Sequence, residues 1–247
     1  MKLGAQLYTV REYCKDLNEL SETLKKVADI GYKTVQMSGT CDYEAEWIKE
    51  ELRKNGLESP LTHYDREKII TSPKEVAQTH KNFDCKYVGI GWYDLNKFTT
   101  KEFIETFSNP AKVILEEGLH LCYHNHDHEF ALENGKTKLD VICENFSFDE
   151  LKITLDTYWA QAGGCDVAKL IRDLNGRTPC IHLKDMAYDR MMMPVGGGNM
   201  NFESIFAAAF DSGVEHAFVE QDNCNGADPF ECLKQSYDYC RSMGITE

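Results

Sequence analysis

The amino-acid sequence predicts an α/β fold, a single (β/α)8 TIM barrel with parallel strands that spans residues 1–247. Three observations lead to this prediction. Short apolar segments alternate with amphipathic helical segments along the whole chain. Eight such segments can be counted, in a length that one barrel commonly occupies. No linker or low-complexity stretch divides the chain, so a single domain is expected.

Each expected strand is a short apolar run, and every one after the first follows a helical segment. The eight strands are expected at Leu3–Tyr8, Thr34–Met37, Ser59–His63, Tyr87–Gly91, Leu119–His124, Ile153–Asp156, Ile181–Lys184 and Ala217–Glu220. Strands separated by helices pair in parallel, because a parallel neighbour needs a long crossover. A doubly wound open sheet is the alternative, but it usually carries a Gly-rich phosphate loop after its first strand, and the sequence YTVREYC at this turn contains none.

Helix boundaries are marked by capping residues, prolines and glycines. Helices are expected to begin at or near Asp16, Ser72, Thr100, Asn201 and Asp228. Ser72 and Asp228 are each followed by a proline and, at the third helical position, by a glutamate, which is a helix-start pattern. Gly31 ends the first helix, since glycine adopts the left-handed cap conformation without strain. Pro110 predicts a kink or break in the helix around Phe107.

Composition and charge exclude several classes of protein. The chain has 27 Lys+Arg and 41 Asp+Glu, a formal net charge of −14, which argues against a nucleic-acid surface. It has no apolar stretch of about 18 residues, the length that a membrane span requires. The N-terminal residues read as a strand rather than as a signal peptide. The ten cysteines include no C-x-x-C pair, so reduced thiols and a cytoplasmic location are expected.

Polar residues gather where the expected strands end, which is the end of a parallel barrel that carries the active site. Five of the eight histidines lie at or just beyond these ends: His63, His124, His126, His128 and His182. Carboxylates and imidazoles that converge on one point repel or desolvate one another unless a cation neutralises them. Four acidic or imidazole residues at four consecutive strand ends are therefore candidate ligands of one divalent ion: Glu129, Asp156, His182 and Glu220. This oxygen-rich set favours Mn²⁺, with Mg²⁺, Co²⁺ and Zn²⁺ as alternatives.

Five segments occur in order along the expected strands: GAQLYTVR, YHNHDHEF, LDTYW, HLKD and VEQD. Together they resemble the xylose-isomerase-like TIM barrels, a superfamily of sugar and sugar-phosphate isomerases and epimerases. The resemblance extends over essentially the whole chain. It implies one divalent ion held by Glu, Asp, His and Glu on successive strands. Asp156, His182 and Glu220 match the last three of these ligands.

The first ligand departs from the pattern of this superfamily. Many members carry a glutamate where this chain has His124. Glu129, five residues further on, is the expected ligand in its place, and His124 or His126 is the alternative.

The resemblance also implies a reaction, the removal of a proton from a carbon next to a carbonyl through a metal-stabilised enediolate. The expected catalytic residues are Glu220 or Glu129 as the base, with the other glutamate, His124 or His126 returning the proton. The expected substrate-binding residues are Gln6, Tyr8, His63, Trp92, Tyr158, Lys184 and Asp185. For Lys184 a salt bridge, and for Trp92 and Tyr158 core packing, are the alternative roles.

The expected function is thus a divalent-metal-dependent sugar or sugar-phosphate isomerase or epimerase with a small carbohydrate substrate. A dehydratase or lyase of a keto-sugar or inosose uses the same parts and is an alternative. A non-catalytic sugar-binding barrel is a second alternative. The abasic-site endonuclease of the same superfamily is disfavoured by the net charge of −14. The sequence leaves homo-oligomer formation open.

Overall fold

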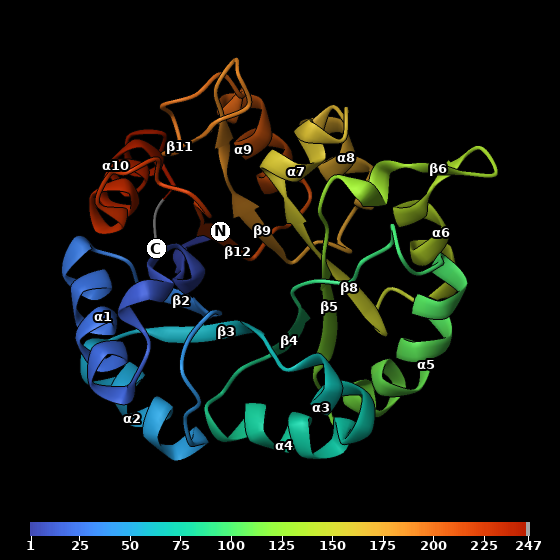
Figure 1. Cartoon of the computed structure of the whole chain (residues 1–247), viewed down its shortest axis with the longest axis horizontal. Coiled ribbons are helices and arrows are strands. Elements are labelled where there is room, and N and C mark those ends of the chain that lie inside the picture. Colours follow the sequence, from blue (N-terminus) through green and yellow to red (C-terminus); the bar gives the residue numbers. More distant parts are fainter. Residues whose placement is uncertain (246–247) are drawn as a thin grey trace.

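A closed barrel of eight parallel strands forms the centre of the computed structural model, which describes residues 1–245 (Figure 1). The barrel strands are β1 (Lys2–Gln6), β2 (Thr34–Met37), β3 (Glu58–His63), β4 (Tyr87–Ile90), β5 (His120–His124), β8 (Leu151–Asp156), β9 (Cys180–Leu183) and β12 (His216–Val219). Around the barrel they follow the order β1, β12, β9, β8, β5, β4, β3, β2. The predicted fold class and all eight strands are confirmed, with strand ends within two residues of those expected.

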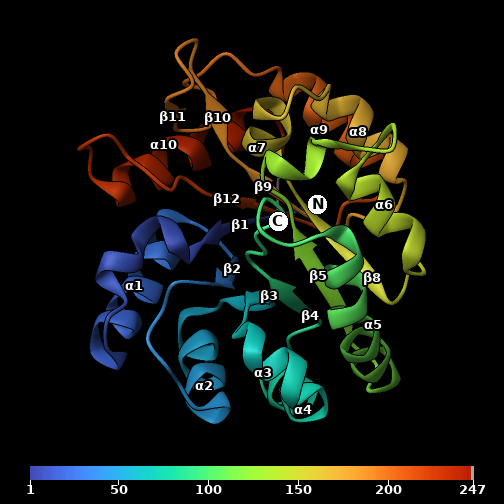
Figure 2. The ribbon, with the colours of Figure 1, turned by 45° about the vertical axis from the view of Figure 1, so that its right-hand side comes forward.

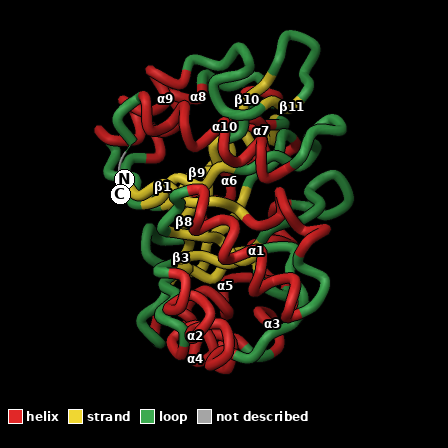
Figure 3. The backbone as a smooth tube through the Cα atoms, turned by 90° about the vertical axis from the view of Figure 1, so that its left-hand side faces the viewer, coloured by secondary structure: helices red, strands yellow, loops and turns green. Residues whose placement is uncertain are grey.

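Helices surround the barrel, as the red segments outside the yellow strands in Figure 3 show. They are α1 (Leu17–Ile30), α2 (Ala45–Asn55), α3 (Arg66–Thr71), α4 (Pro73–Asn82), α5 (Thr100–Glu116), α6 (Lys138–Asn145), α7 (Thr157–Ala162), α8 (Val167–Leu174), α9 (Phe202–Asp211) and α10 (Pro229–Ser242), with 3-10 helices η1 (Leu7–Tyr13) and η2 (His128–Phe130). In Figure 2, α1 to α4 cover one half of the barrel and α6 to α10 cover the other. Among the helices of the described residues, none has the length and apolar character needed to cross a membrane.

Two short antiparallel hairpins, which the sequence analysis did not predict, lie outside the barrel wall. They pair β6 (Leu132–Glu133) with β7 (Lys136–Thr137), and β10 (Asp185–Met186) with β11 (Met192–Met193). Each follows a barrel strand at its carboxyl end, so both stand on the same side of the barrel as the candidate site.

Most of the expected helix starts are confirmed by side-chain hydrogen bonds. Asp16, Asn201 and Asp228 each accept hydrogen bonds from backbone N–H groups in the first turn of their helices. Thr99, not Thr100, caps α5, because only Thr99 stands three residues before Glu102, and the two side chains form a reciprocal capping box. Ser72 precedes α4 as expected but makes no capping hydrogen bond with its side chain.

A kink or a break is expected at Pro110, and the break is wrong, because α5 runs continuously from Thr100 to Glu116 with Pro110 inside it. A proline within a helix removes one backbone hydrogen bond. Here the apolar face of the helix compensates, since Phe103, Phe107 and Pro110 are all buried against the barrel and its neighbours.

The inside of the barrel is filled by alternate residues of the strands, since side chains two apart share one face of a strand. A compact cluster joins buried residues of five strands across the interior: Leu61, Tyr87, Cys122, Cys180 and Phe218. Gly4 makes room for this cluster, because a Cβ atom at Gly4 would lie 2.6 Å from the ring of Phe218. Two positions further along the chain from Cys122, Cys180 and Phe218, the same inner face carries His124, His182 and Glu220.

Candidate metal centre

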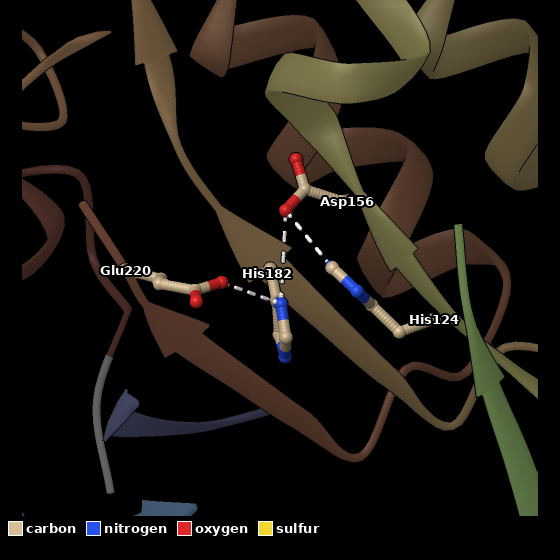
Figure 4. A group of neighbouring side chains, drawn as sticks. All are labelled: His124, Asp156, His182 and Glu220. Atoms are coloured by element: carbon tan, nitrogen blue, oxygen red, sulfur yellow. Dashed lines mark hydrogen bonds and ion pairs between the residues drawn. The ribbon is translucent and has the colours of Figure 1, made fainter. Parts of the chain in front are cut away.

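Four side chains from four neighbouring strands converge on one another, as Figure 4 shows. They are His124 at the end of β5, Asp156 at the end of β8, His182 in β9 and Glu220 directly after β12. All four are buried, and one ligand atom of each lies within 4.8 Å of those of the others. The parallel register produces this convergence, because Asp156 pairs with His182, and the backbone N–H of Glu220 donates to the carbonyl of Leu183 at 3.1 Å.

The outer nitrogen of each imidazole is held by a hydrogen-bond acceptor. Nε2 of His182 donates to Oε1 of Gln36 at 2.6 Å, and Nδ1 of His124 donates to the carbonyl of Gly91 at 3.1 Å. A ring nitrogen that donates carries the proton of a neutral imidazole, so the other nitrogen presents its lone pair. The lone pairs of His182 Nδ1 and His124 Nε2 therefore point into the group.

Each carboxylate is likewise fixed by a hydrogen bond to one of its two oxygens. Oδ1 of Asp156 accepts a hydrogen bond from the backbone N–H of Trp159 at 3.0 Å and thereby caps α7. Oε1 of Glu220 accepts from the side-chain amide of Gln6 at 3.0 Å. The second oxygen of each carboxylate is left to face the centre.

The inward atoms are close to one another, and two of them have no hydrogen-bond partner in the described part of the chain. Nδ1 of His182 lies 2.8 Å from Oε2 of Glu220 and 3.7 Å from Oδ2 of Asp156, and Nε2 of His124 lies 3.1 Å from Oδ2 of Asp156. Within residues 1–245, His182 Nδ1 and Glu220 Oε2 are buried atoms with no hydrogen-bond partner. Two nitrogen and two oxygen donors so placed suit a divalent transition-metal ion, and the residues therefore fit a divalent ion as a class.

Lys184 brings a positive charge to the edge of this group. Its ammonium lies 3.0 Å from Asp156 Oδ2, 3.0 Å from Glu220 Oε2 and 3.0 Å from Asp222 Oδ2, and its side chain is buried. A carboxylate oxygen has two lone pairs, so the contact with Lys184 leaves one on each oxygen for a second cation. Both expected roles of Lys184 are compatible with this position, since it forms salt bridges and also lines the pocket above.

The electrostatics of the group favour ionised carboxylates. Burial raises the pKa of Asp156 and of Glu220, but Lys184 and the imidazoles outweigh burial and hold both pKa values well below the usual range. Burial lowers the pKa of His182, but Glu220 and Asp156 outweigh this and raise it. For His124 burial prevails, and the pKa is lowered. Two negative charges thus face two imidazoles, an arrangement that calls for a proton or a metal ion between them.

A pocket of about 780 Å³ opens above the group at the carboxyl ends of the strands. Eight residues expected to act in catalysis, metal binding or substrate binding line it: Gln6, Tyr8, His63, Trp92, His124, His126, Lys184 and Glu220. His126 packs edge-on against Trp92 with ring centroids 4.3 Å apart, and burial lowers its pKa to about 2. His126 is therefore a neutral imidazole on the wall of the pocket.

Glu129, the expected first ligand, is not a member of the convergent group; His124 is. The carboxylate of Glu129 accepts hydrogen bonds from the hydroxyl of Tyr123 and, at 2.8 Å, from the backbone N–H of His126, and it lies 3.2 Å from His128 Nε2. Glu129 lies in the 3-10 helix η2, which begins at His128 after β5 has ended at His124, and its carboxylate faces these partners there. Of the residues open at this position, His124 is the one in the convergent group.

Two expected substrate-binding residues do not line the pocket. The hydroxyl of Tyr158 donates to the carbonyl of Arg190 at 2.7 Å. Asp185 is buried, and its oxygens accept from the backbone N–H groups of Gly196 and Gly198, both at 2.9 Å, so it holds the segment after β11. Both residues stabilise the loop beside the pocket.

Three residues with polar roles at the site were not among the predicted site residues. Gln36 orients His182, Asp222 pairs with Lys184, and Arg11 lines the pocket with its guanidinium stacked 4.2 Å above the ring centre of Tyr8. Burial and the nearby Glu220 raise the pKa of Asp222 to about 7. Gln36 and Asp222 lie at strand ends, which was the signal that could have identified them, whereas Arg11 lies in η1, which the sequence analysis treated as a turn.

Comparison with known families identifies the fold. A family model for xylose isomerase-like TIM barrels matches residues 24–243. The chain belongs to this family. No functionally curated protein matches the sequence.

Solved structures share the barrel of this xylose isomerase-like chain at low sequence identity. A sugar phosphate isomerase/epimerase from Parabacteroides distasonis is 20% identical, with a TM-score of 0.84, over 100% of this chain and 95% of the other. An L-ribulose 3-epimerase is 13% identical, with a TM-score of 0.75, over 99% and 95%. The "probable 3-DHS dehydratase" of Bacillus anthracis is 16% identical, with a TM-score of 0.74, over 98% and 99%. At these identities the likeness establishes the fold.

Proposed function

We propose that this protein is a divalent-metal-dependent isomerase or epimerase of a sugar or sugar phosphate. The proposal rests on the convergence of His124, Asp156, His182 and Glu220 below an open polar pocket. A hydrogen bond fixes one nitrogen or oxygen of each side chain, and the other nitrogen or oxygen faces the centre of the group. Two of the solved barrels with the same fold are named as an isomerase/epimerase and as an epimerase, which supports the substrate class.

A divalent ion held by these four residues would polarise a substrate carbonyl and stabilise the negative charge that develops when the adjacent carbon loses its proton. Side chains of the pocket would remove the proton and bind the substrate hydroxyls. Glu220 is ionised and lies in the pocket wall, which suits a base that removes this proton. Neutral His126 and His63 stand on the same wall, where each can hold a substrate hydroxyl.

Return of the proton decides the product. Return to the opposite face of the same carbon gives an epimer, and return to the neighbouring carbon gives an isomer. His126, which lines the pocket, is the proposed group for this step: its neutral ring would give its N–H proton to the carbon and regain a proton from Glu220 through solvent, which restores both groups.

Dehydration of a keto-sugar or inosose is the second candidate function, and Lys184 favours it. Loss of a β-hydroxyl places negative charge on the leaving oxygen, and a buried ammonium in the pocket wall can stabilise that charge. One of the solved barrels is named as a probable dehydratase.

The test is a panel of ketoses, 3-keto-sugars, inososes and their phosphates, incubated with metal-loaded protein in D₂O and followed by NMR. An isomerase or epimerase exchanges deuterium into the carbon next to the carbonyl of its substrate. A dehydratase instead gives an unsaturated ketone with new ultraviolet absorption. Full metal occupancy with no exchange and no elimination across the panel would leave a sugar-binding barrel as the function.

A further inference from the structure

The donor set of the centre differs from the one that the sequence favoured. The expected set contained three carboxylates and one imidazole, with Glu129 as the first ligand. The structure brings two carboxylates and two imidazoles together, with His124 in that place. Replacing a charged oxygen donor by a neutral nitrogen donor changes which ions the site prefers, since imidazole suits Zn²⁺, Co²⁺ and Fe²⁺ and carboxylate suits Mg²⁺ and Mn²⁺.

His124 is built into the centre as firmly as the other three residues. Its side chain is only 4% exposed, and its ring packs against those of His182 and His63, with centroids 4.5 and 5.1 Å away. The hydrogen bond from Nδ1 to Gly91 fixes the ring orientation and directs Nε2 toward Asp156. A ring held in this way cannot turn its lone pair to solvent, so the nitrogen is available to an ion in the group.

The charges agree with a divalent ion and two ligand carboxylates. Lys184 lies 3.0 Å from the three carboxylates of Asp156, Glu220 and Asp222 and balances one of their three charges, so two negative charges remain. A doubly charged ion neutralises them, and the two imidazoles add none. A third ligand carboxylate would instead leave a buried negative charge.

We propose that His124 makes this centre selective for an imidazole-preferring transition ion, of the Zn²⁺, Co²⁺ or Fe²⁺ class, over Mg²⁺ and Mn²⁺. This inference rests on the proposed metal-dependent function and specifies its ion. The residue that sets the preference is His124, because it is the member of the donor set that replaces an expected carboxylate.

The first test counts the coordinating imidazoles with Cu²⁺ as the probe. Pulsed EPR of the Cu²⁺-loaded protein is expected to show two coupled imidazole rings, and His124→Glu is expected to show one. His63→Gln and His126→Gln are matched controls, since both residues line the same pocket outside the ligand group, and both variants are expected to retain two. A single ring in the unmodified protein, or two rings in His124→Glu, would overturn the proposal.

The second test measures selectivity by competition between Zn²⁺ and Mn²⁺, with bound metal quantified by mass spectrometry. Most nitrogen and oxygen sites prefer Zn²⁺, so the informative quantity is the change in the ratio of dissociation constants. His124→Glu is expected to reduce the preference for Zn²⁺ by about tenfold or more. An unchanged ratio contradicts the proposal. If this variant does not fold by circular dichroism, His124→Gln removes the nitrogen without adding charge and must also reduce the ratio.

Failure of this inference can be told apart from failure of the proposed function. If one imidazole binds the probe and the Mn²⁺-loaded protein still exchanges substrate protons in D₂O, the ion preference is wrong and the reaction stands. If two imidazoles bind and no metal supports exchange or elimination, the ion preference stands and the reaction is wrong.

Discussion

Among single residues, Glu220 has the most direct proposed role, because it is both a candidate ligand and the candidate base. Glu220→Gln keeps the shape of the side chain and an oxygen that can accept from Gln6, but removes the charge that faces His182. Turnover of a substrate found by the D₂O panel is expected to fall by about 10²- to 10⁴-fold, with an unchanged circular dichroism spectrum. Asp156→Asn is expected to behave alike. Glu203→Gln is the control, because Glu203 is exposed on the surface of α9. Wild-type rates in both Glu220→Gln and Asp156→Asn would contradict the proposed metal-dependent mechanism.

Gln36 gives a residue-scale prediction that concerns binding rather than chemistry. It fixes the proton of His182 on Nε2, so Gln36→Leu leaves all four candidate ligands present but frees the ring. Metal affinity, measured by titration calorimetry, is expected to drop by about 10- to 100-fold. Ser38→Ala is the matched control, since Ser38 follows β2 on the same face and its hydroxyl contacts His63 instead. Equal affinities in the two variants would show that Gln36 does not orient a ligand.

For the residues of the centre, the sequence predicted a position only where that position follows from the alternation of side chains along a strand. Asp156, His182 and Glu220 lie at strand ends, and alternation along each strand directs them inward, so their convergence follows from the sequence. Glu129 lies beyond the strand in an irregular segment whose path depends on its own contacts with Tyr123 and His126. A favourable residue type at short sequence distance was therefore not enough to place it.

At the scale of elements, the hairpin β10–β11 and the glycine-rich segment after it depend on Asp185. Its carboxylate accepts from the backbone N–H groups of Met186, Gly196, Gly198 and Met200. Asp185→Ala leaves these donors without a partner, and the free energy of unfolding is expected to fall by about 3 kcal/mol.

Hydrogen exchange should locate the effect of Asp185→Ala, with faster exchange at Gly196, Gly198 and Met200 than in the rest of the chain. Asp189→Ala is the control in the same loop, because Asp189 accepts a single backbone hydrogen bond, from Met191. A uniform increase across the barrel would mean that Asp185 supports the whole fold rather than this loop.

Helices and strands were predictable where local chemistry decides them. Asp16 and Asp228 cap helices because their side chains bond to backbone N–H groups two and three residues on, which is a purely local interaction. Pro110 shows the limit of local reasoning, since burial of the surrounding apolar face keeps α5 continuous. The hairpins escaped prediction because each strand is only two residues long and carries no periodic signal.

For the whole molecule, the barrel follows from repetition. Eight strands that alternate with helices must pair in parallel, and closure leaves the barrel without exposed strand edges. The strand count and the end of the barrel that carries the site were therefore predictable. The position of Glu129 was not, because it lies beyond β5 in a segment outside the repeating pattern.

Stability of the whole barrel is expected to depend on pH through His80, which joins α4 to the barrel wall. Its Nδ1 donates to the carbonyl of Val76 at 2.7 Å, its Nε2 accepts from the hydroxyl of Thr62 at 2.9 Å, and burial lowers its pKa to about 4. In the unfolded chain the pKa is about 6.5, so between these values the unfolded state binds a proton that the folded state does not. The free energy of unfolding should therefore decrease as the pH falls from about 6.5 to about 4, with about 3 kcal/mol from this residue.

Urea unfolding of the wild type and of His80→Gln at pH 7.5 and pH 4.5 checks this, because the variant should lose less stability on acidification. His216, whose pKa burial also lowers to about 4, contributes in the same range, so His216→Gln should reduce the acid sensitivity as well. Equal losses in the wild type and both variants would assign the acid sensitivity to other groups.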